Sequence, residues 1–138
     1  VNGFFRNRGT NYVRAFRKFL NQSNFSDDEI IIHATGRYPL TDGTFLEQCY
    51  NLESDKIGCF KKDDHGQFHL FLYGMRFKYL KELMNKIDTD HMEKNMINLE
   101  SIFANNIPHN SVKLVSHLGI LGRQSNEKDP NKYGKIEF

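Results

Sequence analysis

Residues 67–87 read QFHLFLYGMRFKYLKELMNKI and combine two patterns that decide the fold. The first seven residues are dense in aromatic residues and leucine, which is typical of a buried strand. After Gly74, apolar residues recur at the i, i+3, i+4, i+7 spacing of one helix face: Leu80, Leu83, Met84 and Ile87. The stretch therefore predicts a strand that ends at Gly74 and a helix that follows at once.

Further elements are predicted toward the amino terminus. The β-branched run at residues 29–34 (EIIIHA) predicts a strand. Thr10 is a candidate cap for an earlier helix. The apolar stripe of that helix consists of Val13, Phe16 and Leu20. Residues 2–6 are a candidate strand, and residues 37–66 are interpreted as an insertion with a candidate short helix at residues 44–52.

Toward the carboxyl terminus, Asp90 and Glu93 have the spacing of a capping box and predict a third helix. The apolar stripe of this helix consists of Met96, Leu99 and Phe103. Residues 111–115 and 132–138 predict two strands of a hairpin joined by the polar arm at residues 122–131.

The order of these elements interleaves strands and helices. This predicts the α/β (α+β) class, with helices covering a mixed sheet. The length of 138 residues suits a single domain, 1–138. No run of about 18 apolar residues occurs, so we expect no membrane span and no membrane partner. Cys49 and Cys59 are too few for a disulfide scaffold and are expected to be reduced thiols of an intracellular protein.

The charge is small overall and unevenly distributed. Nineteen basic and seventeen acidic residues give a net charge of +2, which argues against a polybasic binder. Residues 1–26, however, carry five basic residues and no acid, whereas residues 27–138 carry fourteen basic and seventeen acidic residues. A basic end on a nearly neutral body favours contact with a polyanion, although a solvated helix face would have the same composition.

Enzyme chemistry has little support in the sequence. Among the six histidines, only His65 and His69 are closely spaced, and no acid lies between them as in the zinc-protease motif. No P-loop, dinucleotide fingerprint or serine-hydrolase motif occurs, so we expect no catalytic residue, no metal and no cofactor. The alternative is a metal-dependent nuclease that uses Asp63, Asp64 and His65, although acidic pairs of this kind commonly form turns.

Nucleic-acid binding has the best support, because basic residues cluster on the connections between elements. Free amides at the start of the helix after Gly74 would also suit phosphate oxygens. Aromatic residues stand among the charges, and some of them could stack on unpaired bases. The candidate RNA-binding residues are Arg6, Arg8, Arg14, Arg17, Lys18, Arg76, Lys78, Arg123, Lys128 and Lys132. A third hypothesis is a protein-interaction module whose basic helix docks an acidic partner.

Several segments resemble the Alba superfamily. NYVRA (residues 11–15) is similar to its first helix, and residues 67–87 are similar to its second strand, glycine turn and second helix. EIIIHATG (residues 29–36) resembles the same strand and glycine pattern. Two segments therefore match the second strand of the superfamily, and the resemblance does not choose between them. Residues 112–138 resemble the final hairpin with its arm. The resemblance implies an Alba-like two-layer sandwich with a four-stranded sheet, to which the insertion at residues 37–66 is added.

Within the superfamily, the order of segments is most similar to the Alba-like subunits of yeast ribonuclease P and ribonuclease MRP. The segments that carry this are VNGFFRN, FLYG and GRQSNE. The lysine pair that precedes the first helix in archaeal Alba proteins is absent, and Arg6 and Arg8 lie nearby instead. The third helix and the insertion are additions to the superfamily's pattern.

The resemblance implies a noncatalytic RNA-binding subunit of a nuclear (nucleolar) ribonucleoprotein. Such subunits form a heterodimer with a second Alba-like subunit. The pair binds a stem with an internal loop in the ribonuclease P or MRP RNA, for tRNA and rRNA processing, and in yeasts also telomerase RNA. Leu80, Leu83 and Met84 would partly serve this partner interface, and their alternative role is core packing.

Overall fold

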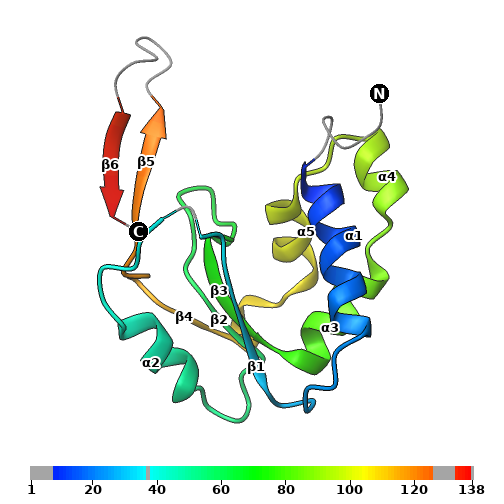
Figure 1. The fold of residues 1–138 in the computed structure, drawn as a ribbon, viewed down its shortest axis with the longest axis horizontal. Coiled ribbons are helices and arrows are strands. Elements are labelled where there is room, and N and C mark those ends of the chain that lie inside the picture. Colours follow the sequence, from blue (N-terminus) through cyan, green and yellow to red (C-terminus); the bar gives the residue numbers. More distant parts are fainter. Residues whose placement is uncertain (1–7, 37, 126–132, 138) are drawn as a thin grey trace.

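A computed structural model describes residues 8–36, 38–125 and 133–137 (Figure 1). The side chains described are those of residues 9–36 and 38–121. The elements in chain order are α1 (Arg8–Asn21), β1 (Ile30–Ala34), α2 (Thr44–Tyr50), β2 (Gly58–Phe60), β3 (Leu72–Arg76), α3 (Phe77–Lys86), α4 (Thr89–Lys94), α5 (Leu99–Asn106), the 3-10 turn η1 (His109–Ser111), β4 (Val112–Leu114), β5 (Leu121–Ser125) and β6 (Tyr133–Glu137).

The main sheet has four strands in the order β1-β3-β2-β4. Strand β3 is antiparallel to both of its neighbours, whereas β2 and β4 run parallel. The prediction of a mixed sheet covered by helices is therefore confirmed. Residues 37–66, which the sequence analysis assigned to an insertion, supply the inner strand β2. Only three residues long, this strand offers too short a pattern to be recognised in the sequence.

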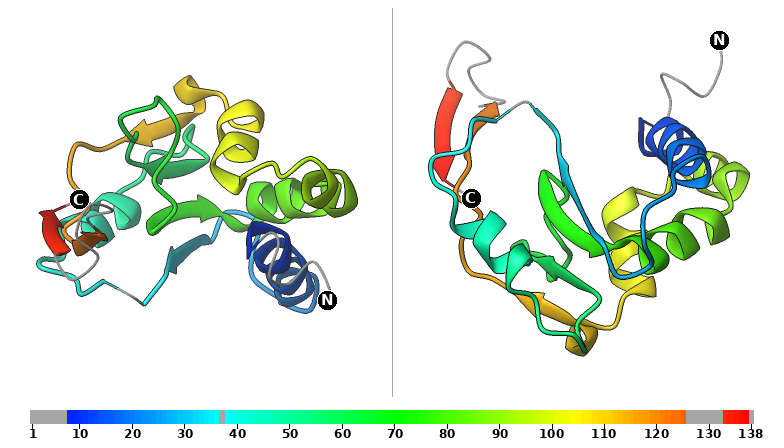
Figure 2. Two further views of the ribbon diagram at one scale, coloured as in Figure 1. Left: turned by 90° about the horizontal axis from the view of Figure 1, so that it is seen from above. Right: turned by 60° about the horizontal axis from the view of Figure 1, so that its bottom comes forward.

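Both faces of the sheet are covered. On β3, Tyr73 and Met75 point into a large core shared with α1, α3, α4 and α5, because successive side chains of a strand point to opposite faces. Leu72 points to the other face, where a second cluster includes Phe45 and Cys49 of α2. Figure 2 shows α2 separated by the sheet from the other helices. The short helix α2 thus closes the face that the larger helical layer leaves open.

Gly74 lies inside β3 and does not end it, which corrects the predicted strand boundary. It pairs with Ile32 on β1 and with Cys59 on β2. A Cβ atom at this position would lie only 2.7 Å from the Sγ atom of Cys49. The glycine therefore lets α2 approach the sheet closely, and β3 continues to Arg76.

Two predicted helix starts are also corrected. Helix α1 begins at Arg8, so Thr10 lies inside it as a buried residue and does not cap it. Asp88, not Asp90, caps α4 by accepting hydrogen bonds from the amides of Asp90 and His91. The predicted third helix is divided into α4 and α5, and Met96, which has a φ of 53°, lies in the turn that separates them.

Strands β5 and β6 form a separate antiparallel hairpin, with Leu121 opposite Glu137. The predicted pairing of residues 111–115 with residues 132–138 is wrong, because β4 joins the main sheet beside β2. The hairpin projects away from the sheet (Figure 1). The candidate strand at residues 2–6 lies outside the described residues. Of the helices described, none has both the length and the apolar character needed to cross a membrane.

Candidate nucleic-acid interface

Half of the ten candidate RNA-binding side chains lie outside the described part of the chain. Arg6, Lys128 and Lys132 lie outside the described residues altogether. Only the backbone is described for the other two: Arg8 is the first residue of α1, and Arg123 is the middle residue of β5. The roles predicted for these five residues stay predictions.

The sequence places Arg76 at the start of the helix after Gly74, and Arg76 is indeed the N-cap residue of α3, but its guanidinium group is occupied within the chain. Its Nε atom donates to the carbonyl of Lys56 at 2.8 Å, and Nη1 donates to the carbonyl of Asp28 at 2.8 Å. Nη2 donates to the carbonyl of Glu53 at 3.0 Å. The side chain thus ties two loops to the junction of β3 and α3.

The first amides of α3 are occupied as well. The amide of Phe77 donates to the carbonyl of Glu29 at 2.7 Å, and the amide of Lys78 donates to the carbonyl of Asp27 at 3.1 Å. The start of a helix binds anions through amides that have no other acceptor. The expectation of free amides here is therefore wrong for the first two residues of the helix.

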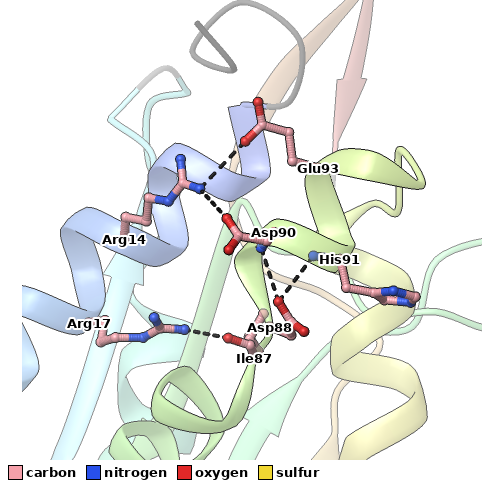
Figure 3. A network of polar contacts seen from close by, with 7 residues as sticks. All are labelled: Arg14, Arg17, Ile87, Asp88, Asp90, His91 and Glu93. Atoms are coloured by element: carbon pink, nitrogen blue, oxygen red, sulfur yellow. Dashed lines mark hydrogen bonds and ion pairs between the residues drawn. The ribbon is translucent and has the colours of Figure 1, made fainter.

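Arg17 also has an internal role (Figure 3). Its Nε atom donates to the carbonyl of Met84 at 2.8 Å, and Nη2 donates to the carbonyl of Ile87. These carbonyls lie at the C-terminal end of α3, where the helix dipole favours a positive charge. Arg17 therefore fastens α1 to the end of α3.

Arg14 forms a looser contact with α4. Its Nη2 atom lies 3.4 Å from a carboxylate oxygen of Asp90 and 3.5 Å from one of Glu93. The side chain of Arg14 is 44% exposed and that of Asp90 is 95% exposed, so solvent screens the pair. Arg14 can exchange these carboxylates for another anion at little cost.

A surface between α1 and α3 combines Lys18 and Lys78, which were among the predicted RNA-binding residues, with Phe19, Phe25 and Lys81, which were not. Phe19 and Phe25 are 49% and 40% exposed, and their ring centroids lie 6.3 Å apart. Phe25 in turn meets the ring of Phe77 edge-on at 5.6 Å, and Nζ of Lys81 lies 5.6 Å from the Phe77 ring centroid. The exposed Lys18 precedes Phe19 in the sequence. The aromatic–lysine surface is defined as Lys18, Phe19, Phe25, Lys78 and Lys81.

The sequence pattern does not show that the two phenylalanines of this surface are exposed. Phe19 widens the apolar stripe of α1, so the pattern assigns it to the core. Phe25 lies in a loop, where no periodicity identifies it. Lys78 and Lys81 face outward at spacings typical of any solvated helix.

The three candidate partner-interface residues lie in the core of the chain itself. Leu80 and Met84 are fully buried, and Leu83 is 5% exposed. This is the alternative role that the sequence left open for them. No side chain of the three is available to a partner while α3 packs as it does.

The candidate nuclease residues form a turn. One oxygen of Asp63 accepts hydrogen bonds from the amides of His65 at 2.8 Å and Gln67 at 2.9 Å. In the described ranges, no three His, Cys, Asp or Glu side chains converge in a way that could hold a metal ion. Asp63 therefore has the turn-forming role that short acidic residues commonly have.

Comparisons with protein-family models, curated proteins and solved structures find no match. The function is therefore inferred from the residues of this surface. Exposed aromatic rings beside ammonium groups can stack on unpaired bases and contact the phosphates between them. The same region also carries exposed Asp27 and Asp28 in the loop before β1, which oppose a strong nonspecific attraction for polyanions.

Proposed function

We propose that the protein is a noncatalytic RNA-binding protein whose aromatic–lysine surface holds unpaired bases. The observation that carries the proposal is the pair of exposed phenylalanine rings, Phe19 and Phe25, together with Lys81, whose Nζ atom lies 5.6 Å from the centroid of the Phe77 ring that Phe25 contacts. Burying such rings against bases removes apolar area from water, and each stacked base contributes about 1–3 kcal/mol. Lys18, Lys78 and Lys81 would contact the phosphates.

The finer proposal is a subunit of ribonuclease P or ribonuclease MRP in the nucleus, paired with a second Alba-like subunit. It rests on the resemblance of the sequence to that family. The net charge of +2 supports the need for a partner, because affinity for nucleic acid increases with the number of phosphates neutralised. A partner would extend the basic surface, and the target would be a stem with an internal loop.

The proposal is tested by titrating the chain with a fluorescent stem-loop RNA that contains an internal loop and with a fully paired RNA of equal length. We expect weak, salt-sensitive binding that favours the looped RNA. Replacing both Phe19 and Phe25 by serine should weaken binding to the looped RNA roughly tenfold or more, since base stacking is lost. Lys18→Glu with Lys81→Glu should weaken binding and reduce its dependence on salt.

Two matched controls come from other parts of the chain. Tyr50, on α2, is 90% exposed, so Tyr50→Ser removes an exposed aromatic ring from the other side of the sheet. Lys62→Glu reverses an exposed charge beyond β2. Both variants should bind the looped RNA like the unaltered chain. Equal losses in controls and test variants, tight binding to both RNAs by the lone chain, or metal-dependent cleavage of the RNA would overturn the proposal.

A further inference from the structure

Two cysteines from different elements meet beneath α2. Cys49 lies on α2 and Cys59 on the inner strand β2, and neither forms a disulfide. Both belong to the second core cluster and are almost fully buried. Their thiols are the two nucleophilic groups of that cluster, and the proposed RNA surface uses neither of them.

The position of Gly74 brings the two thiols together. Cys59 lies directly opposite Gly74 in the antiparallel pairing of β2 and β3. Residues paired in this way point to the same face, with Cβ positions about 4.5–5.5 Å apart. The Sγ atom of Cys49 lies 2.7 Å from the position that a Cβ atom of Gly74 would have. The Cys49 sulfur thus occupies the space beside the Cys59 side chain that a larger residue at position 74 would fill.

From this juxtaposition we propose that Cys49 and Cys59 form a redox-active dithiol, which a low-molecular-weight disulfide oxidises to a disulfide linking α2 to β2. The thiolate of Cys59 attacks the small disulfide, forms a mixed disulfide and releases one small thiol. The sulfur of Cys49, losing its proton, then attacks the Cys59 sulfur and releases the second small thiol. The protein loses two hydrogens, and the small disulfide gains them as two thiols.

The surroundings assign different roles to the two sulfurs. The hydrogen bond from Cys49 lowers the pKa of Cys59 and outweighs burial, which raises it, and the ammonium group of Lys113, the neighbour of Cys59 on β4, also lowers it. The same hydrogen bond and burial raise the pKa of Cys49. Cys59 is therefore the attacking thiolate, and Cys49 is the thiol that resolves the mixed disulfide.

Access to the pair depends on α2. This helix has only seven residues, and Tyr50 next to Cys49 is 90% exposed. We expect α2 to open locally without unfolding of the remaining core, because a helix of this length has little stability of its own. The reagent reaches Cys59 during such openings, so oxidation should be slow and complete under native conditions.

The test is to incubate the full chain with oxidised glutathione in native buffer, block remaining thiols with iodoacetamide in denaturant, and measure intact mass. We expect a monomer that has lost two hydrogens, takes up no iodoacetamide, and regains two reactive thiols after treatment with dithiothreitol. Peptide mapping should join the segments that contain Cys49 and Cys59. Recovery of two alkylated thiols, or oxidation that occurs only in denaturant, would overturn the proposal.

Single-cysteine variants separate the two roles. Cys49→Ser should accumulate a stable adduct of one glutathione on Cys59, because the resolving thiol is gone. Cys59→Ser should form its adduct on Cys49 more slowly. Circular dichroism checks that both variants are folded. Equal adduct formation in two folded variants would contradict the assignment of Cys59 as the attacking thiolate.

Discussion

The hydroxyl oxygens of Tyr12 and Tyr73 lie 2.7 Å apart and form a hydrogen bond between α1 and β3. Tyr73 is fully buried, and its ring stacks on Phe60 in the main core. Burial raises the pKa of both tyrosines, so both hydroxyls are protonated at neutral pH. The pair therefore links the helical layer to the sheet through two neutral groups.

Tyr12→Phe removes one partner of this bond and leaves the hydroxyl of Tyr73 buried without it. We expect a loss of about 1–2 kcal/mol in the free energy of unfolding, measured by urea denaturation. Adding Tyr73→Phe should recover part of this loss, because no polar group then remains buried. Strictly additive effects of the two substitutions would show that the hydroxyls do not interact.

Arg76 should act on stability and not on RNA binding. Arg76→Lys keeps the charge but cannot reproduce the planar set of donors to the carbonyls of Asp28, Glu53 and Lys56. We expect it to lower the free energy of unfolding by about 2 kcal/mol. Lys78→Ala, on the exposed side of α3, should change stability by less than about 0.5 kcal/mol. The opposite order in urea denaturation would contradict the internal role of Arg76.

The two arginines of α1 should differ in the same way. Arg17→Ala removes two donors from carbonyls at the end of α3 and should cost about 1–2 kcal/mol in thermal or urea unfolding. Arg14→Ala breaks only the exposed contacts with Asp90 and Glu93, so we expect a change within about 0.5 kcal/mol. A larger effect of Arg14 would mean that this ion pair is held more rigidly than its exposure implies.

Local patterns in the sequence predict helices and strands well, but they predict the hydrogen-bond partners of individual side chains poorly. The apolar stripe of Leu80, Leu83 and Met84 predicts α3 correctly, and the β-branched run predicts β1, because both signals depend only on spacing. An arginine at position 76 indicates a positive charge at the start of a helix. Its acceptors belong to loops that are distant in the sequence, so no local pattern can show that the guanidinium group is occupied.

Gly74 illustrates the same limit. Glycine after an apolar run commonly ends a strand, and only the contact with α2 reveals why it lies inside β3. Phe25 is a further case, because a loop residue has no periodicity that distinguishes an exposed ring from a buried one. The candidate binding surface consequently depends on tertiary contacts that emerge only when α1 and α3 pack together.

Gly74→Ala should strain the contact between β3 and α2. The added methyl group would lie 2.7 Å from the Cys49 sulfur and 3.3 Å from a methyl carbon of Ile30. Such overpacking typically costs about 1–3 kcal/mol. Adding Cys49→Ala removes the sulfur and should recover part of the loss in urea denaturation. If Cys49→Ala gives no recovery in the double variant, the Cys49 sulfur is not the atom that requires glycine at this position.

His33 should make the stability of the protein depend on pH. Its ring lies among aromatic groups, with centroids 5.1 Å from Tyr12, 6.0 Å from Phe16 and 5.2 Å from Tyr73. Burial lowers the pKa of His33 below 6.5, and a backbone hydrogen bond with Leu70 offsets part of this shift. The two tyrosines that contact the ring are neutral, so neither of them compensates a charge on the imidazole.

The direction of the effect follows from proton binding. Between the lowered pKa of the folded state and 6.5, the unfolded chain binds a proton at His33 that the folded chain does not. The free energy of unfolding is therefore highest above pH 6.5 and falls as the pH drops below it, by at most about 1.4 kcal/mol per pH unit for one group. Because His33 is only partly buried, we expect a smaller slope.

Urea denaturation of the unaltered chain and of His33→Gln between about pH 7.5 and 5.5 measures this contribution. The difference in slope isolates His33, because the other titrating groups are common to both proteins. His69 serves as an internal comparison, since burial and Lys61 also lower its pKa. His69→Gln should reduce the slope independently, and the double variant should show both reductions. Equal slopes for His33→Gln and the unaltered chain would mean that the imidazole is protonated as readily in the folded state as in the unfolded chain.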